Sequence, residues 1–245
     1  MKFKPLAASR FFFATQPLPC PYLPGKMERR VVMELFGRDV TSLHDYLTQT
    51  GYRRSHGIAY APVCPDCQAC VPVRIRVADF TPSRSQRRVW SKNKTLSAFL
   101  SPLAVTEEQY DLFATYLRTR HSGGEMEKME LQDYKSLVEE TPIDSQIVEF
   151  RNSDGDLVAA CLLDVISDGL SAVYSFFDPA LERASPGTFM VLWLIEEARR
   201  RGLPYVYLGY WIAESQKMSY KSTFRPLEAF SVDGWHQLDD DGVGA

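Results

Sequence analysis

The stretch "GTFMVLWLIEEARRRGLPYVYLGYWI", from Gly187 to Ile212, decides the fold. Its first half predicts a helix that begins at Pro186, because proline suits the first helical turn and Ser185 before it can serve as the N-cap. Gly202 ends this helix, and Pro204 prevents the chain from resuming it. The run "LPYVYLGYW" that follows is rich in aromatic and β-branched residues, which predicts a strand.

Three strand-like runs precede this helix, between Ser145 and Pro179. The dipeptides Asp154-Gly155 and Asp168-Gly169 separate them, and Asp-Gly is a strong signal for a tight hairpin turn. Hairpins followed by a helix and a further strand predict a mixed α/β layer. The pattern is compatible with the N-acyltransferase fold of the acetyltransferase superfamily. The expected fold class is therefore α/β (α+β), with a mixed sheet in the second half of the chain.

The rest of the chain gives a coarser outline. We expect helices from Ser42 to a stop at Gly51, from Glu107 to Arg120 and from Glu130 to Glu139. The runs "GIAYAPV" and "VPVRIRV", residues 57–63 and 71–77, predict two strands that form a hairpin. The organisation expected is a smaller N-terminal domain at residues 1–100 and an acetyltransferase-like domain at residues 101–245.

Composition is that of a globular protein: 245 residues, 45% of them hydrophobic and 24% charged. No run reaches the roughly 18 apolar residues of a membrane-spanning helix. The apolar patch at residues 6–14 is interrupted by Ser9 and Arg10 and has no clear cleavage site, so no signal peptide and a cytoplasmic location are expected. The net charge is −3, yet residues 71–106 contain seven Lys and Arg and a single acid, Asp79. This basic segment predicts a surface for a polyanion.

The sequence "CPDCQAC", residues 64–70, holds three of the five cysteines and forms the loop of the predicted hairpin. Four cysteine thiolates, often in Cys-x-x-Cys pairs, suit tetrahedral zinc, and Cys-x-x-Cys-x-x-Cys with a remote fourth ligand suits an iron–sulfur cluster. A tightly packed turn without metal is the third reading, and the pattern does not choose among them. The candidate ligands are Cys20, Cys64, Cys67 and Cys70, whereas Cys161 lies in an apolar strand and is expected in the core.

Several stretches together resemble one family. They are "CPYLPGKMER" at residues 20–29, "GYRRSHGIAYAPVCPDCQACVPVRI" at 51–75, "FTPSRSQRRVWSKN" at 80–93, "YSFFDP" at 174–179, the stretch at 187–212 and "KMSYKSTFRPLE" at 217–228. They are similar to the aminoacyl-tRNA–protein transferases of the N-degron pathway, most closely to the bacterial aspartate/glutamate leucyltransferase branch, which is related to the eukaryotic arginyltransferases. The resemblance covers nearly the whole chain in the same order.

The resemblance implies a reaction. Leucine passes from the 3′ end of Leu-tRNA to the α-amine of a protein that begins with Asp or Glu, and the transfer needs no cofactor. It also implies an acetyltransferase-like fold for the second half, with aminoacyl-tRNA in place of acetyl-coenzyme A. Eukaryotic relatives are associated with N-terminal cysteines that bind zinc or an iron–sulfur cluster, but their ligand spacing differs.

Two sets of residues are candidates for tRNA contact. Arginine and lysine neutralise phosphates, and aromatic rings stack on bases. The candidates are Arg84, Arg87, Arg88 and Lys92 in the basic segment, and Lys217, Tyr220 and Lys221 near the C-terminus. The free backbone N–H groups at the start of the helix at residues 185–188 are expected to bind phosphates of the terminal nucleotides.

An acidic acceptor calls for guanidinium groups, which bind a carboxylate through two parallel hydrogen bonds. Arg74 and Arg76 alternate with valines and so share one strand face; with Arg54, and its neighbour Arg53, they are the candidates for acceptor binding. Amide formation from an activated ester needs alignment, proton removal and oxyanion stabilisation. The candidates for these catalytic roles are Tyr174, Ser175 and Asp178, although Asp178 before a proline also suits a turn.

Three alternatives stay open at this point. An arginyl-tRNA–protein transferase would use the same acceptors and a different donor pocket. A non-catalytic zinc-knuckle RNA-binding protein would need only residues 20–93. A coenzyme A-dependent acetyltransferase is disfavoured, because "ASPGTF" has one glycine where a pyrophosphate loop needs two or more.

Overall fold

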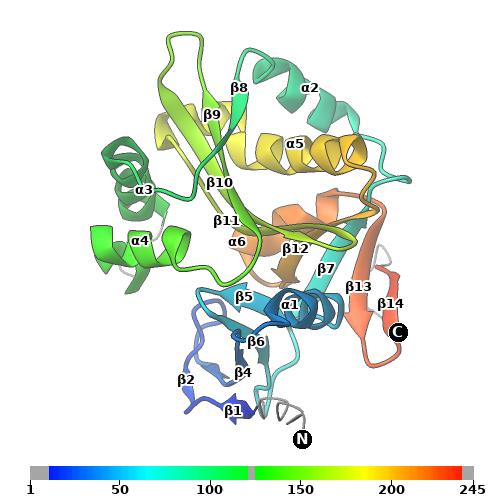
Figure 1. Cartoon of the computed structure of the whole chain (residues 1–245). Helices are drawn as coiled ribbons and strands as arrows, with labels where there is room; N and C mark the ends of the chain where they lie inside the picture. The colour runs from blue at the N-terminus through cyan, green and yellow to red at the C-terminus, as the bar shows by residue number, and fades with distance from the viewer. Residues whose placement is uncertain (1–10, 121–124, 239–245) are drawn as a thin grey trace, which may run out of the picture.

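An eight-stranded sheet forms the centre of the molecule (Figure 1). The structure is a computed structural model that describes residues 11–120 and 125–238. The strands run in the order β14-β13-β7-β12-β11-β10-β9-β8. Their bounds are β7 Val71–Arg76, β8 Ser97–Ser101, β9 Ser145–Arg151, β10 Leu157–Ile166, β11 Gly169–Phe177, β12 Tyr205–Trp211, β13 Leu227–Ser231 and β14 Gly234–Gln237.

The predicted core of the second half is confirmed. Strands β9, β10 and β11 form two successive antiparallel hairpins that turn at the two Asp-Gly dipeptides. Gly155 in the first turn has φ +92°, a left-handed conformation that favours glycine. Helix α5, Pro186–Arg200, then carries the chain to β12, which pairs in parallel with β11. This arrangement is the mixed α/β layer that the sequence predicts.

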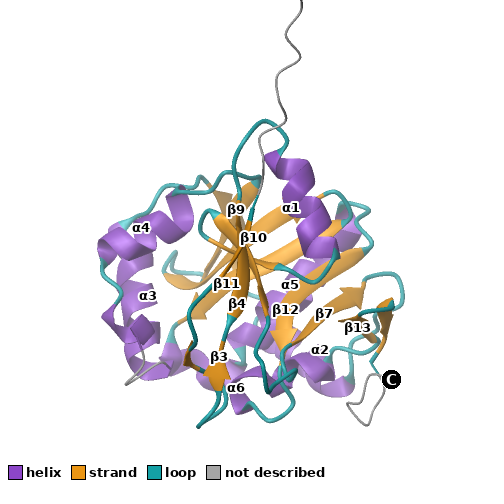
Figure 2. Cartoon of the chain, turned by 90° about the horizontal axis from the view of Figure 1, so that it is seen from below, coloured by secondary structure: helices purple, strands orange, loops and turns teal. Residues whose placement is uncertain are grey.

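Helices cover both faces of the sheet, as Figures 1 and 2 show. Successive residues of β10 point to opposite sides: Cys161 packs with the α5 layer and Leu162 with the other layer. The other layer consists of α3, Glu107–Arg120, and α4, Leu131–Glu139, whose bounds match the predictions closely. A short 3₁₀ turn, η1 at Glu125–Lys128, lies between them. Cys161 is 1% exposed, which confirms its expected place in the core.

A second, smaller sheet packs against one end of the large sheet. Its order is β1-β4-β6-β5, with bounds β1 Phe12–Ala14, β4 Arg30–Glu34, β5 Arg53–Ser55 and β6 Ile58–Pro62. A two-stranded ribbon, β2 Leu18–Pro19 and β3 Met27–Glu28, lies beside it, and α1, Val40–Gln49, covers it. Met33, Leu35, Leu47 and Ala59 form its small apolar core.

The predicted cysteine hairpin is wrong in its pairing. Both strands form, but β6 pairs with β4 and β5, whereas β7 pairs with β12 and β13 of the large sheet. The cysteine loop is therefore a connection between the two sheets. Strands β7 and β8 both belong to the large sheet, and the division into domains at residue 100 stays a prediction. The first helix also begins earlier than predicted, at Val40 rather than Ser42.

Candidate active site at the diverging strands

The parallel strands β11 and β12 pair only at their beginnings. Their register runs from Gly169 opposite Tyr205 to Ser171 opposite Tyr207. Beyond these three pairs, β11 continues to Phe177 and β12 to Trp211, each paired only with its other neighbour, β10 or β7. The C-terminal halves of the two strands therefore diverge, and side chains from elsewhere can enter between them.

Arg53 of β5 enters this gap. Its Nη2 atom donates a hydrogen bond to the carbonyl oxygen of Val173 in β11, at 2.5 Å. On the other side it lies against Gly209 of β12, where a Cβ atom would come within 1.8 Å of Arg53 Nη1. Gly209 has φ +70°, so both its conformation and its lack of a side chain fit the guanidinium beside it. Arg53 Nη1 is itself buried and has no hydrogen-bond partner among the described residues.

The same end of the sheet gathers the segments that follow the two strands. Strand β11 leads through η2, Pro179–Ala184, to the start of α5, and β12 leads to α6, Gln216–Ser219, and η3, Tyr220–Thr223. The carboxyl ends of parallel strands share one edge, which is where α/β folds bind their ligands. The predicted catalytic residues and the predicted C-terminal tRNA contacts thus reach one region.

Two further buried donors lie on these strands. The Tyr174 hydroxyl of β11 and the Trp211 indole Nε1 of β12 are buried without a hydrogen-bond partner in the described structure. Tyr174 packs edge-on against Phe113 of α3, with ring centroids 5.7 Å apart. Burial raises the pKa of Tyr174 far above its usual value, so the hydroxyl is a donor at neutral pH. Buried polar atoms nearly always have partners, so such atoms mark a place that a ligand can fill.

Exposure and hydrogen bonding differ among three further candidates, Asp178, Lys217 and Lys221. Asp178 Oδ1 accepts a hydrogen bond from the Ala180 amide at 2.9 Å and so caps η2, the turn role that the sequence also allows. Lys217 is exposed, whereas Lys221 is only 5% exposed and donates from Nζ to the Tyr210 carbonyl oxygen at 2.5 Å. Burial, and next the charge of Arg53, hold the pKa of Lys221 well below its usual value.

The arginines predicted for the acceptor mostly have partners within the protein. Arg54 is buried and binds Asp164 through two hydrogen bonds of 2.7 and 2.8 Å. Arg74 donates from Nε to Glu228 at 2.7 Å. Its guanidinium also stacks on Tyr205 at 3.6 Å and on Trp235 at 4.2 Å from the ring centroids. Both guanidinium groups therefore hold the fold together.

Arg76 is the more accessible member of the set. Its side chain is 47% exposed and pairs with Asp79 at 2.6 Å. It lies at the far end of β7, opposite Tyr205, whereas Val71 at the near end lies opposite Trp211. Five residues of strand separate Arg76 from that near end, roughly 17 Å. The alternation predicts that Arg74 and Arg76 share one face, but it cannot show which end of the sheet they occupy.

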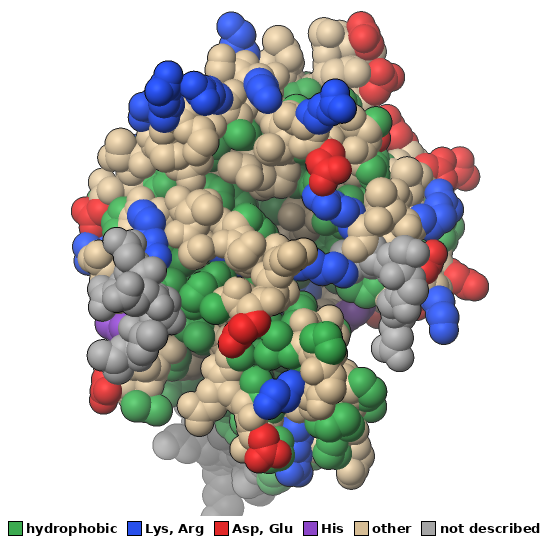
Figure 3. Space-filling view, turned by 180° about the vertical axis from the view of Figure 1, so that it is seen from behind, with side chains coloured by type: hydrophobic (Ala, Val, Ile, Leu, Met, Phe, Trp, Pro, Cys, Tyr) green, Lys and Arg blue, Asp and Glu red, His purple; other side chains and the backbone are tan. Residues whose placement is uncertain are grey.

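The basic segment forms helix α2, Arg84–Lys92. Ser83 caps it in a reciprocal capping box with Gln86. The predicted tRNA contacts on α2 are all exposed, and Lys and Arg side chains gather at the top of the face in Figure 3, where Figure 1 places this helix. The end of α2 is fixed beside the start of α5, because Lys92 donates to the Arg183 carbonyl and Asn93 to the Ala184 carbonyl.

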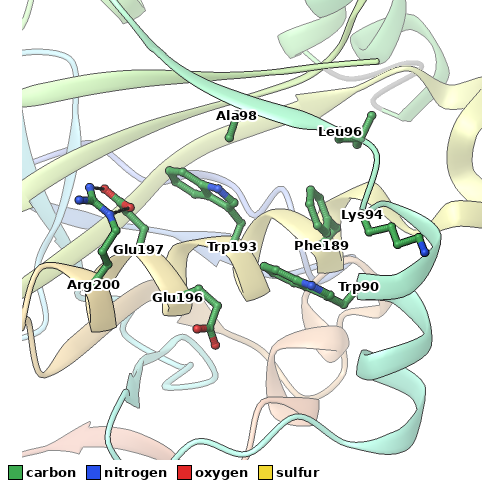
Figure 4. Close-up of a pocket in the computed structure, with 9 residues that line it drawn as sticks. All are labelled: Trp90, Lys94, Leu96, Ala98, Phe189, Trp193, Glu196, Glu197 and Arg200. Atoms are coloured by element: carbon green, nitrogen blue, oxygen red, sulfur yellow. Dashed lines mark hydrogen bonds and ion pairs between the residues drawn. The ribbon is translucent and has the colours of Figure 1, made fainter. Parts of the chain in front are cut away.

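A pocket of about 360 Å³ lies between α2, α5 and β8. Figure 4 shows Trp193, Phe189 and Trp90 along it, with Arg200 and Lys94 at opposite ends. Arg200 is paired with Glu197 at 2.7 Å. Aromatic walls beside an exposed basic helix are a combination that the sequence pattern does not reveal, since Trp90 and Trp193 are 103 positions apart.

The four candidate metal ligands lie near one another, close to the first residue of β7, because Cys70 directly precedes this strand and the other three thiols are near Cys70. Burial first, and then the thiols of Cys20, Cys64 and Cys67, raise the pKa of Cys70 to about 12. A buried thiol with three other thiols near it is a donor set that suits zinc or an iron–sulfur cluster, because a cation would stabilise the thiolates. Within residues 11–120 and 125–238, however, no three His, Cys, Asp or Glu side chains are arranged to hold a metal ion.

Comparison with known proteins identifies the family. Residues 18–88 match the family model described as arginine-tRNA-protein transferase, N terminus, and residues 108–231 match the one described as its C terminus. The chain is 59% identical over 234 residues to the aspartate/glutamate leucyltransferase of Paramagnetospirillum magneticum, covering 96% of both chains. The chain belongs to the aspartate/glutamate leucyltransferase family. It is therefore an enzyme of the aminoacyl-tRNA–protein transferase group, as the sequence motifs predict.

A second leucyltransferase, from Rhodospirillum rubrum, is 51% identical over 239 residues and 97% of both chains. Among solved structures, the crystal structure of FemX has a TM-score of 0.50 at 8% identity, covering 80% of this chain and 68% of that one. The likeness concerns the fold, and it agrees with the acetyltransferase-like layer that the leucyltransferase sequence predicts. No helix in the described parts of the chain is long and apolar enough to cross a membrane.

Proposed function

We propose that this protein transfers leucine from Leu-tRNA to the α-amine of proteins that begin with Asp or Glu. The observation that carries the proposal is the 59% identity, over 96% of both chains, to an aspartate/glutamate leucyltransferase. The same relationship disfavours the two alternatives of arginyl transfer and of a non-catalytic RNA-binding protein. Charged tRNA is a cytoplasmic molecule, so we place the reaction in the cytoplasm.

The chemistry required is modest. The acceptor amine attacks the ester carbonyl that joins leucine to the tRNA, the C–N bond forms, and the ester C–O bond breaks to release the 3′ oxygen of the tRNA. The enzyme must align the two groups and stabilise the negative charge on the carbonyl oxygen. The free donors at the diverging strands, above all the Tyr174 hydroxyl, support a site at this end of the sheet. Ser175 and Asp178 lie within the next four residues, and we keep them as further candidates.

For the tRNA, we propose a surface that runs along α2 to the start of α5. It comprises Arg84, Arg87, Arg88 and Lys92, with Lys217, Tyr220 and Lys221 in and beside η3, which α2 contacts through the hydrogen bond from Gln86 to the Thr223 carbonyl. The hydrogen bonds of Lys92 and Asn93 to the loop before α5 support this continuity. The N-terminus of α5 then faces the phosphates near the 3′ end. Because Lys221 is buried, we expect it to act nearer the reacting groups than the other members.

For the cysteines, we propose that Cys20, Cys64, Cys67 and Cys70 hold zinc or an iron–sulfur cluster that fixes the connection between the two sheets. The proposal is supported by the proximity of the other three thiols to Cys70, whose pKa they raise together with burial. Metal analysis and absorbance spectra after anaerobic purification distinguish zinc from iron and sulfide. Fully active protein without either would reject the proposal.

The acceptor carboxylate also needs a binding group. Arg54, Arg74 and Arg76 stay candidates for this role, but each already pairs with a carboxylate of the protein. An acidic N-terminus would have to displace Asp164, Glu228 or Asp79 to bind there. A cation without such a partner would suit the role better.

One assay tests the proposed function. Purified protein is incubated with radiolabelled Leu-tRNA or Arg-tRNA and with peptides that begin with Asp, Glu or Ala. We expect leucine to be incorporated into the Asp and Glu peptides and not into the Ala peptide. Transfer from Arg-tRNA alone would overturn the leucyl assignment, and no transfer from either tRNA would overturn the proposed function.

A further inference from the structure

Arg53 is a cation at the diverging strands that lacks a carboxylate partner. Its Nη2 atom donates a hydrogen bond to the Val173 carbonyl, and its Nη1 atom is buried and free. Its chain neighbour Arg54 points to the opposite face of β5 and is fully paired with Asp164. Among the described residues, no Asp or Glu lies within ion-pair distance of Arg53.

Lys221 is a second such side chain, and it lies close to the first. It is 5% exposed, bonds only a backbone carbonyl among its described neighbours, and feels the charge of Arg53. Burying a guanidinium without an anion is costly, because arginine stays charged at every physiological pH, and an anion from outside would also favour the charged form of the nearby Lys221 amine. The arrangement therefore calls for an anion from outside the chain.

The remaining donors define what kind of anion fits. Tyr174 and Trp211 lie on the unpaired C-terminal halves of β11 and β12, with Tyr174 packed on the α3 side of the sheet and Trp211 on the α5 side, and the hydroxyl of the one and the indole N–H of the other lack partners among the residues that the structure describes. A guanidinium edge with neutral N–H and O–H donors around it matches a carboxylate, whose two oxygens can accept about four hydrogen bonds. A phosphodiester would bring a sugar on each side, and the exposed cations of α2 suit it better than these buried donors.

We infer that Arg53 is the specificity-determining residue for the acceptor: its guanidinium binds the side-chain carboxylate of the N-terminal Asp or Glu, with Tyr174 and Lys221 beside it. This inference rests on the proposed function and assigns the acceptor pocket to the C-terminal ends of β11 and β12. It places the α-amine next to the start of α5, where the aminoacyl end of the tRNA is expected. Arg54 and Arg74 then support the fold around the pocket without contacting the acceptor.

The test compares acidic peptides with their amides, which have the same shape and no charge. Steady-state transfer from Leu-tRNA is measured with peptides that begin with Asp or Asn, for the wild type and for Arg53→Lys and Arg53→Gln. Loss of one partner of an enclosed charge pair costs about 30-fold or more. We expect kcat/KM for the Asp peptide to fall by that factor in Arg53→Gln, through KM, while transfer to the Asn peptide changes by less than about threefold.

Arg118→Gln, an exposed arginine on α3 bonded to Thr115, serves as the matched control and should leave both peptides unaffected. Thermal unfolding identifies a variant that fails to fold, and Arg53→Lys, which keeps the charge, should then show an intermediate preference for Asp. An unchanged Asp-to-Asn ratio in both Arg53 variants would overturn the inference. A raised KM for Leu-tRNA with the ratio unchanged would also overturn it and assign the pocket to a phosphate. No transfer by the wild type would instead overturn the proposed function.

Discussion

The backbone of Gly209 lies so close to Arg53 that a methyl group on Gly209 would fall within 1.8 Å of the Arg53 Nη1 atom. The two residues come from different sheets, so this contact couples the small sheet to the gap between β11 and β12. Any residue with a side chain at position 209 would therefore force the Arg53 guanidinium to move from its observed position.

Gly209→Ala should therefore lower both stability and transfer to acidic acceptors. The left-handed conformation alone costs an alanine about 1 kcal/mol, and displacement of Arg53 adds to it, so we expect the free energy of unfolding to fall by about 1–3 kcal/mol. Gly202→Ala is the matched control, because Gly202 has nearly the same φ, +71°, and a Cβ atom there would have nothing within 4 Å. Urea unfolding and the Asp-to-Asn ratio are measured. Equal effects of the two changes would contradict the steric argument.

Removing the partner of Arg54 should be costly. Asp164 is fully buried and accepts hydrogen bonds from Arg54 and from Ser145, the latter at 2.7 Å. Asp164→Asn leaves an enclosed guanidinium without its counter-charge, so we expect a loss of about 3–5 kcal/mol in the free energy of unfolding. Glu182→Gln removes an exposed pair with Arg120 and should cost about 0–1 kcal/mol. Similar values for the two variants would show that the Arg54 pair is not structural.

Stability should fall as the pH drops below about 6.5, the ordinary pKa of histidine. Burial lowers the pKa of His44, with the nearby Asp164 opposing and Arg54 reinforcing that effect. The unfolded chain then binds more protons than the folded one, so stability is lost as pH falls through this range and is fully present above it. Urea unfolding at pH 5.5 and 7.5 should give a smaller difference for His44→Gln than for the wild type. An identical difference would exclude His44 as the source.

Charge removal on α2 should weaken tRNA binding in a salt-dependent way. Arg84→Gln combined with Arg88→Gln removes two exposed cations, so we expect a higher KM for Leu-tRNA. The slope of log affinity against log salt should become shallower by about 1–2, since each phosphate contact contributes about 0.7–0.9. Arg118→Gln with Lys128→Gln, away from α2, is the control with the same charge change. An equal effect of both pairs would indicate a non-specific charge effect instead of a defined surface.

Local patterns predict the local elements well. The bounds of α3 match residue for residue and α4 differs by one, because helical periodicity and capping residues lie within the segment itself. The Asp-Gly turns define the hairpins of β9, β10 and β11 for the same reason. The cysteine hairpin failed because its two strands pair with different sheets, and partners as distant as β12 leave no trace in the local sequence.

The candidate site was predictable as a set of segments but not as a set of contacts. The motifs at residues 174–179 and 217–221 lie at or after the carboxyl ends of the neighbouring strands β11 and β12, whereas their role in a site stays a prediction. Nothing in "GYRRSHG" distinguishes Arg53 from Arg54, yet the alternation of β5 sends one into the gap and the other to Asp164, 110 positions away. The separation of a free arginine from a paired one depends on tertiary contacts alone.

The position of β7 has a consequence for how the protein can be made. This strand comes from the first third of the chain but lies between β12 and β13 in the sheet. During synthesis, about 130 further residues must be added after β7 before its first partner strand, β12, has been made. Strand pairing across such sequence distances is slow, and an unpaired apolar strand invites association with other chains. We therefore expect that neither of the two segments matched by separate family models folds into monomeric protein when it is expressed alone. Co-expression of the two segments should restore the folded protein.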